Sequence, residues 1–343
     1  MPMKLLSKLI SFSGLKKTGT EPVDQQRITD DELNQAIDHV VDSIYEKIRY
    51  YPAYKKILGN SVLTSLIYID KLIESIPGPL QISNKTFSTH AKIRSYFSSL
   101  STMHEIFNNS SELRDFVKEP MNSNLDEVYA LLCMHATEKT VFGMTLQDDI
   151  IQRDVRQKTL NFTDHNILSP AATEHEVRNG IKQCIFDGLI TYALQQILKV
   201  EERKQGLTSQ RSALKARLTA RQSEAGGLNQ LLATASGNTE PDIEHLIQEN
   251  ENKLSQLPAS WDTPKYYIEM IKEILQQPEQ FIRISSKSFN LSKTGVTSTA
   301  AFSEPADTIA FNEIVISNVL QRVVEIVRYP RNDIREKQKF HSQ

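Results

Sequence analysis

The sequence of 343 residues lacks most features that identify a functional class directly. Its two cysteines, Cys133 and Cys184, lie far apart in the chain. A disulfide framework is therefore not expected, and a reducing, cytoplasmic compartment is the simpler prediction. No run of about 18 apolar residues is present, so no helix is expected to span a membrane. The formal net charge of -2 gives no global attraction to nucleic acid or to an anionic membrane.

Signatures of phosphate binding, structural zinc and hydrolysis are also missing. The 12 glycines form neither a G-x-G-x-x-G nor a Walker A spacing, and there is no C-x-x-C pair and no G-x-S-x-G elbow. His104 and His175 each begin a pattern of the H-E-x-x-H type, but asparagine stands where the second histidine is needed. The sequence therefore predicts no cofactor, no metal site and no catalytic residue.

The residues that are present predict an α+β fold that is mainly α-helical. Thr29 with Glu32 three residues later is a capping box, and helices are expected from there to residue 137, the last over 124–137. From Thr140 the sequence alternates between apolar and polar residues, which predicts a small mixed or antiparallel sheet. The expected strands are 140–146, 155–163, 281–291, 308–317 and 322–330, the first two forming a hairpin joined by 147–154.

These patterns predict the organisation of the whole chain. The predicted parts are an amphipathic segment (1–17), a linker (18–26), a helical domain (27–137), an α+β domain (138–196 and 259–330) with an inserted helical hairpin (197–258), and a polar tail (331–343).

Heptad spacing predicts that the insertion is an antiparallel coiled coil. Apolar residues recur at alternating spacings of three and four on both sides of a glycine-containing break. The first arm carries seven Lys or Arg between residues 199 and 221, and the second carries five Asp or Glu between 240 and 251. With Gly226 and Gly227 at the tip, Leu207 is expected to face Leu246.

This hairpin is the predicted docking site for a protein partner, which makes the chain a non-catalytic interaction or scaffold protein. The residues expected to bind the partner are Arg211, Lys215, Leu218, Gly226 and Gly227. The basic arm lacks interleaved aromatic residues and faces an acidic arm, which argues against nucleic-acid binding.

The first residues, MPMKLLSKLISFSGLKK, predict a short amphipathic helix that can lie on an anionic membrane surface. Lysines fall on the face opposite to the apolar residues, and Lys8 interrupts the apolar run that a secretory signal needs. The predicted membrane contacts are Leu5, Leu6, Leu9, Ile10, Phe12, Lys4 and Lys8. Docking of this helix on the protein's own surface, or disorder, are the alternatives.

Two groups of polar residues leave an enzymatic function open as an alternative. Residues 148–158 have the residue types of a metal-dependent phosphodiesterase or nucleic-acid-processing site, because clustered carboxylates hold divalent ions and a lysine stabilises phosphate charge. The residues concerned are Asp148, Asp149, Asp154 and Lys158. A polar turn between strands is the preferred interpretation, because aspartate is common in turns. Asp164 beside His165 can orient an imidazole for proton transfer, but no nucleophile can be assigned, so a turn is again the preferred interpretation.

Overall fold

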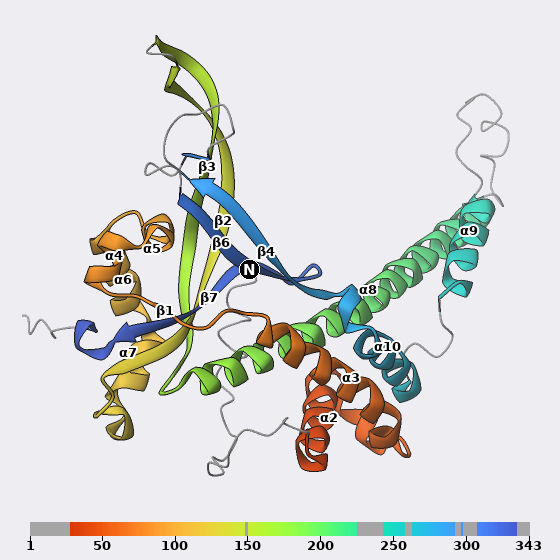
Figure 1. The fold of residues 1–343 in the computed structure, drawn as a ribbon. Helices are drawn as coiled ribbons and strands as arrows, with labels where there is room; N and C mark the ends of the chain where they lie inside the picture. Colours follow the sequence, from red (N-terminus) through yellow and green to blue (C-terminus); the bar gives the residue numbers. More distant parts are fainter. Residues whose placement is uncertain are drawn as a thin grey trace, which may run out of the picture. The chain divides into compact units, whose positions relative to one another are not determined.

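The computed structural model describes residues 28–147, 150–224, 243–257, 263–291, 296–297 and 307–334 (Figure 1). Of residues 143–147, 150–153, 221–224 and 296–297, only the backbone is described. The chain divides into two compact units. Of the described residues, unit 1 takes 64–189 and those from 277 onward, and unit 2 takes 28–63 and 190–276. Each unit combines segments of the predicted helical domain with segments of the α+β domain or its insertion.

Unit 1 is built on a seven-stranded sheet with the order β1-β7-β2-β3-β5-β4-β6. Because β6 also pairs with β7, the pairings close on themselves. The strands are β1 (Leu80–Gln81), β2 (Glu127–Gln147), β3 (Ile150–Ala171), β4 (Ile282–Leu291), β5 (Val296–Thr297), β6 (Asp307–Ile316) and β7 (Leu320–Pro330). Among the described strands, only β1 pairs in parallel, with β7, and the other pairings are antiparallel. Short connections, as between β2 and β3 and between β6 and β7, favour antiparallel pairing.

Helices of unit 1 cover both faces of this sheet (Figure 1). On one face lie α4 (Asn84–Thr89), α5 (Ala91–Tyr96), α6 (Leu100–Asn109) and α7 (Ser111–Lys118), which share one apolar core with the sheet. The first turns of α8 (Glu174–Glu224) lie on the other face. There, a Cβ atom on Gly188 of α8 would lie 2.5 Å from Cδ1 of Ile316, so glycine allows the helix to approach the strand closely.

The helix predicted over 124–137 is wrong, because β2 begins at Glu127. Val128, Ala130, Leu132 and Met134 are buried in the core on one face of the sheet. Leu131, between them, is buried as well, on the opposite face. A strand that is covered on both sides has a nearly continuous apolar sequence, and helical periodicity fits such a run equally well.

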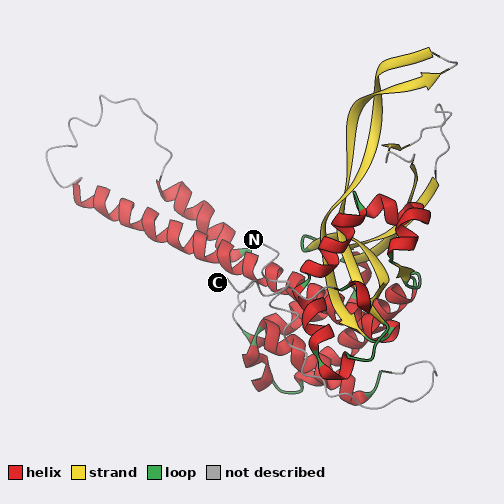
Figure 2. Cartoon of the chain, turned by 90° about the vertical axis from the view of Figure 1, so that its left-hand side faces the viewer, coloured by secondary structure: helices red, strands yellow, loops and turns green. Residues whose placement is uncertain are grey.

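The hairpin of β2 and β3 is longer than predicted. Strand β2 pairs with β7 only up to Met134, but it continues to pair with β3 as far as Gln147 and Ile150. Most of the predicted connection 147–154 is therefore strand. We call residues 135–147 and 150–163 the β-ribbon, which extends beyond the rest of the sheet (Figure 2). Within the described residues, Lys158 and Thr159 pair with β5, and otherwise the strands of the ribbon pair with each other.

Unit 2 is helical. It contains α2 (Asp30–Ile44), η1 (Glu46–Tyr50), the first turns of α3 (Tyr54–Glu74), the later turns of α8, α9 (Ile243–Ser255) and α10 (Pro264–Gln276). The capping box predicted at the start of α2 is present, with the Glu32 amide donating to Oγ1 of Thr29 at 3.3 Å. Tyr267 of α10 stacks on Tyr45 with 4.3 Å between ring centroids. The remaining short helices, all in unit 1, are η2 (Pro120–Asn122), η5 (Pro278–Gln280) and η6 (Arg331–Asp333).

The predicted fold class, α+β and mainly α, is confirmed. The 51-residue helix α8 continues from unit 1 into unit 2, and α9 lies beside its later turns (Figure 2). Residues 84–96 form two short helices, α4 and α5, because Ser83 and then His90 each begin a new helix.

Candidate interaction surface

The burial of side chains changes along helix α8. Ile181, Ile185, Leu189, Ala193 and Ile197 are buried, as the core of a compact body requires. From 201 to 220, where side chains of α8 are described, none of them is buried. A stripe of half-buried residues continues there at spacings of three and four, and it comprises Glu201, Lys204, Leu207, Arg211, Leu214 and Leu218. The heptad pattern therefore persists beyond the core.

Helix α9 packs alongside this part of α8. Nδ2 of Asn250 donates to Oε1 of Gln210 at 3.2 Å, and Nζ of Lys215 lies 3.0 Å from Oε1 of Glu251. We call residues 201–224 of α8 and 243–257 of α9 the helical arm. Within unit 2, it extends away from α2 and α10 (Figure 1).

The register of α8 against α9 differs from the expected register by one heptad. Leu246 shares a surface depression with Leu214, seven residues beyond the Leu207 that the sequence predicts as its neighbour. Registers one heptad apart present equivalent apolar positions, so the repeat alone does not choose between them. The polar pair Gln210–Asn250 distinguishes them, because it forms in only one register.

The depression between α8 and α9 is a groove of about 330 Å³. Each helix contributes four side chains at spacings of three, one and three residues, which is one face of a helix. The residues that line it are Gln210, Ala213, Leu214 and Arg217 of α8 with Leu246, Glu249, Asn250 and Lys253 of α9. The lining combines two leucines, an alanine and two amides with charged residues of both signs. An amphipathic helix binds in a groove through residues at this same spacing.

The predicted partner-binding residues take different positions on the arm. Arg211 and Leu218 are half-buried in the stripe, while Lys215 is exposed and pairs with Glu251. Gly226 and Gly227 lie outside the described residues. None of the described ones lines the groove. Sequence reasoning missed all eight lining residues, because the lining depends on the register of the two helices.

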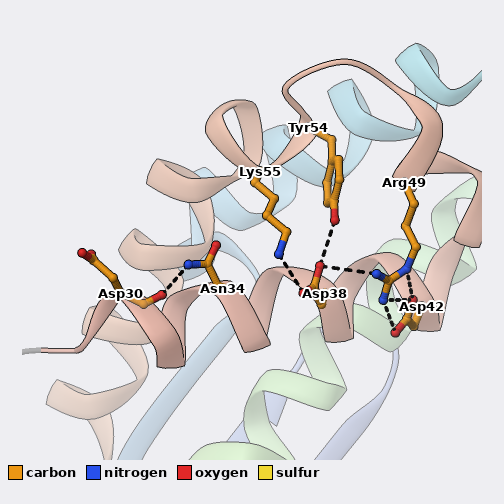
Figure 3. Close-up of polar contacts among 7 residues, drawn as sticks. All are labelled: Asp30, Asn34, Asp38, Asp42, Arg49, Tyr54 and Lys55. Carbon is orange, nitrogen blue, oxygen red and sulfur yellow. Dashed lines mark hydrogen bonds and ion pairs between the residues drawn. The ribbon is translucent and has the colours of Figure 1, made fainter.

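A second polar cluster of unit 2 joins α2 to η1 and α3 (Figure 3). Asp38 accepts hydrogen bonds from Oη of Tyr54 at 2.9 Å and from Nζ of Lys55 at 2.8 Å. Arg49 donates two hydrogen bonds to the carboxylate of Asp42, at 2.8 and 2.7 Å. Burial raises the pKa of Asp38, but the bonds from Lys55 and Tyr54 outweigh it, so the net pKa lies below its usual value. These charges bind one another, and the cluster therefore joins helices rather than presenting a reactive group.

Asp164 and His165, for which proton transfer was the less favoured interpretation, do not form a proton-transfer dyad. Asp164 has φ of 57° and its carboxylate binds Nη2 of Arg322 at 2.8 Å. His165 donates from Nε2 to the carbonyl of Tyr96 at 2.7 Å and stacks on Phe97. Burial lowers the pKa of His165 in spite of that hydrogen bond. The imidazole is thus a half-buried structural side chain of β3, held against Tyr96 and Phe97.

The described part of residues 148–158 holds no assembled metal site. Asp154 lies in β3 with φ of 59° and is exposed, and Nζ of Lys158 lies 3.8 Å from Oε2 of Glu138. Asp148 and Asp149 lie outside the described residues. Throughout the described ranges, no group of three His, Cys, Asp or Glu side chains is arranged to hold a metal ion.

The other reactive residue types in unit 1 have structural surroundings. His104 lies between the hydroxyl of Tyr329, at 2.8 Å, and the amide oxygen of Asn84, at 2.6 Å. Burial raises the pKa of the Cys133 thiol to about 12 and that of Cys184 to about 11, which makes both poor nucleophiles at neutral pH.

Sequence reasoning also missed a buried ion pair beneath α5. Glu325 on β7 is 3% exposed and binds Nζ of Lys92 at 2.8 Å and the hydroxyl of Tyr96 at 2.9 Å. No spacing in the sequence connects residues that are more than two hundred positions apart. The carboxylate has no open approach and fixes α5 on the sheet.

The predicted membrane contacts, Lys4, Leu5, Leu6, Lys8, Leu9, Ile10 and Phe12, lie outside the described residues. Among the helices that the structure describes, none is long and apolar enough to cross a membrane. No protein-family model, curated protein or solved structure matches the chain.

Proposed function

We propose that the chain is a non-catalytic interaction protein whose helical arm docks a helix of a protein partner. The observation that carries the proposal is the change along α8 from buried residues before Ile197 to a half-exposed heptad stripe after Glu201. A helix that served only the core would have no need of these further turns. From Glu201 to Glu224, α8 extends about 35 Å at 1.5 Å per residue, which suits a docking arm.

The groove of the arm supports a helical partner rather than a small ligand. Its lining follows two turns of each helix, with Ala213 leaving room for close approach and Leu214 and Leu246 offering apolar contacts. Arg217 and the ion pair of Lys253 with Glu249, at 2.7 Å, also line the groove and give it the charge that the polar rim of a protein interface has. A partner helix would cover the leucines and contact these charged residues.

A photo-crosslinking experiment tests this proposal on the full chain. A photoreactive amino acid at Ala213, which lines the groove, should form a discrete adduct with one protein in cells that express the chain. The matched control is Ala216, an exposed alanine of the same helix outside the groove lining. Adducts that are equally diffuse from both positions, or absent from both, would contradict a docking site in the groove.

We also propose that the chain is cytoplasmic and peripheral to an anionic membrane through its first seventeen residues. Apolar burial and attraction of lysines to anionic lipid would both contribute, and the second contribution is screened by salt. Binding to anionic vesicles should weaken as salt is raised, and it should be lost in Leu6→Asp with Leu9→Asp. If the wild type ignores such vesicles while the double variant precipitates, the segment docks on the protein itself.

A further inference from the structure

We infer that the partner in the groove is a second copy of this chain, so that two helical arms pair as a four-helix bundle. This inference rests on the proposed function, because it names the occupant of the same groove. Three features of the arm support it: an unpaired buried amide, complementary charge on the two helices, and helix faces that both helices contribute to the groove.

The unpaired amide belongs to Asn250, which lines the groove and is only 5% exposed. Its Nδ2 donates one hydrogen to Gln210, but among the described residues no donor reaches its buried Oδ1. A buried carbonyl oxygen without a donor is unfavourable. The groove therefore favours an occupant that brings a hydrogen-bond donor to this point.

A second Asn250 provides that donor. In a twofold interface, a residue beside the axis meets its own copy. Each side-chain amide has one acceptor oxygen and two N–H groups, of which Gln210 uses one. Two copies of Asn250 can therefore exchange hydrogen bonds, each donating its second N–H to Oδ1 of the other. Buried asparagines at core positions fix register and helix number in coiled coils in this way.

The charges of the two helices also favour a second copy. Between residues 199 and 224, α8 carries seven Lys or Arg and three Glu, whereas residues 243–257 carry three Glu and one Lys. Within one arm these signs already attract, as in the pair of Lys215 with Glu251 at 3.0 Å. When two arms pack about a twofold axis, the basic α8 of each copy can lie against the acidic α9 of the other. Opposite charges then alternate around the bundle.

Helices α8 and α9 each contribute residues at the same spacing to the groove. In a bundle of two arms, the two helices of one arm would pack with this face against the same face of the other arm. Leu214 and Leu246, half-exposed in a single arm, would become the core of the bundle.

Analytical ultracentrifugation of the full-length protein tests the inference. The wild type should sediment as a concentration-dependent dimer. Asn250→Asp should weaken the dimer about tenfold or more at neutral pH, because it places two carboxylates together at the axis. At a pH below the carboxyl pKa, protonation should restore the dimer. The matched control is Asn252→Asp, which adds the same charge at an exposed position of the same helix and should leave the dimer unchanged.

A mixing experiment separates contact between copies from damage to the arm. Asn250→Asp and Asn250→Lys should each be largely monomeric at neutral pH. Mixed in equal amounts, they should form a heterodimer, because opposite charges then meet across the axis. A misfolded arm could not be rescued by a second misfolded arm.

The outcomes distinguish this inference from the proposed function. A wild type that stays monomeric at every concentration, or an Asn250→Asp variant that dimerises like the wild type, would overturn the inference. If the wild type is monomeric while a crosslinker at Ala213 captures a different protein, the docking function stands and the second copy is wrong. If Ala213 captures nothing and no dimer forms, both are wrong.

Discussion

The β-ribbon of unit 1 and the helical arm of unit 2 are both hairpins that extend beyond a core, but they are stabilised differently. The ribbon is held by backbone pairing, and Phe142 and Val141 on it are 66% and 37% exposed. The arm is held by side chains, through its heptad stripe, Gln210 with Asn250, and Lys215 with Glu251. The ribbon therefore depends on the core from which it grows, because an isolated two-stranded hairpin is marginal in water. The arm carries its own contacts and a groove.

The largest expected effect lies at the base of the β-ribbon. Phe162 is 8% exposed and packs edge-on against Tyr96 and Phe311. Phe162→Ala should lower the free energy of unfolding of unit 1 by about 3–5 kcal/mol through the cavity it leaves. Phe142→Ala, the same change on the exposed part of the ribbon, should alter it by less than about 0.5 kcal/mol. Urea unfolding followed by circular dichroism measures both, and similar losses would mean that the outer ribbon is part of the core.

The next largest effect is expected in the pH dependence of stability, which should distinguish the base of the β-ribbon from the helical arm. Burial lowers the pKa of His165 at the base of the ribbon, so the unfolded chain binds its proton more tightly than the folded chain does. The stability of unit 1 should therefore fall as the pH drops through the unfolded histidine pKa of about 6.5 toward the lower folded value.

His165→Gln keeps a side-chain donor for the Tyr96 carbonyl and should reduce this loss. Thermal unfolding at a series of pH values, for both proteins, gives the comparison. An unchanged pH slope in the variant would show that other groups cause the acid sensitivity.

A smaller effect is expected in the arm. Lys215 and Glu251 pair with side chains that are 55% and 40% exposed. Lys215→Ala should therefore destabilise the packing of α9 by no more than about 1 kcal/mol, and high salt should remove the difference. Amide hydrogen exchange in α9 measures it. Loss of protection throughout unit 2 would show instead that the arm is coupled to the helical core.

The smallest expected effect is that of a divalent metal ion on the melting temperature. A metal site in the β-ribbon would make the ribbon, rather than the arm, the functional hairpin. A metal that bound Asp149 and Asp154 would stabilise the folded state by mass action. We expect magnesium or manganese to leave the melting temperature of the wild type unchanged, as in the control Asp149→Asn with Asp154→Asn. A gain confined to the wild type would favour the phosphodiesterase alternative over the interaction protein.

The sequence predicted the arm better than the ribbon for a physical reason. Heptads and the capping residue Thr29 act over three or four residues, and the structure has the helices that they predict. The strand over Val128–Met134 was mistaken for a helix because both of its faces are buried, so it does not alternate between apolar and polar residues. The pairing of Glu325 with Lys92 was not predictable at all, because the two residues meet only where α5 packs on the sheet.

The register of α8 against α9 was only partly predictable from the sequence. The repeat predicted two helices with opposite charge, but it allowed Leu246 to face either Leu207 or Leu214. The choice depends on Asn250, a single polar side chain that sequence periodicity treats as an exception. The groove lining depends on the register, so Ala213 could not be assigned to it in advance.

The central claim is that the arm is a docking element separable from the core. It is tested most directly by thermal unfolding of a chain in which residues 203–256 are replaced by a short Gly/Ser linker. The replacement keeps Glu201, which accepts a hydrogen bond from Tyr267, and the buried Ile197. We predict that the shortened protein retains a cooperative transition close to that of the wild type. Loss of that transition would contradict the account, because it would make the arm part of the core.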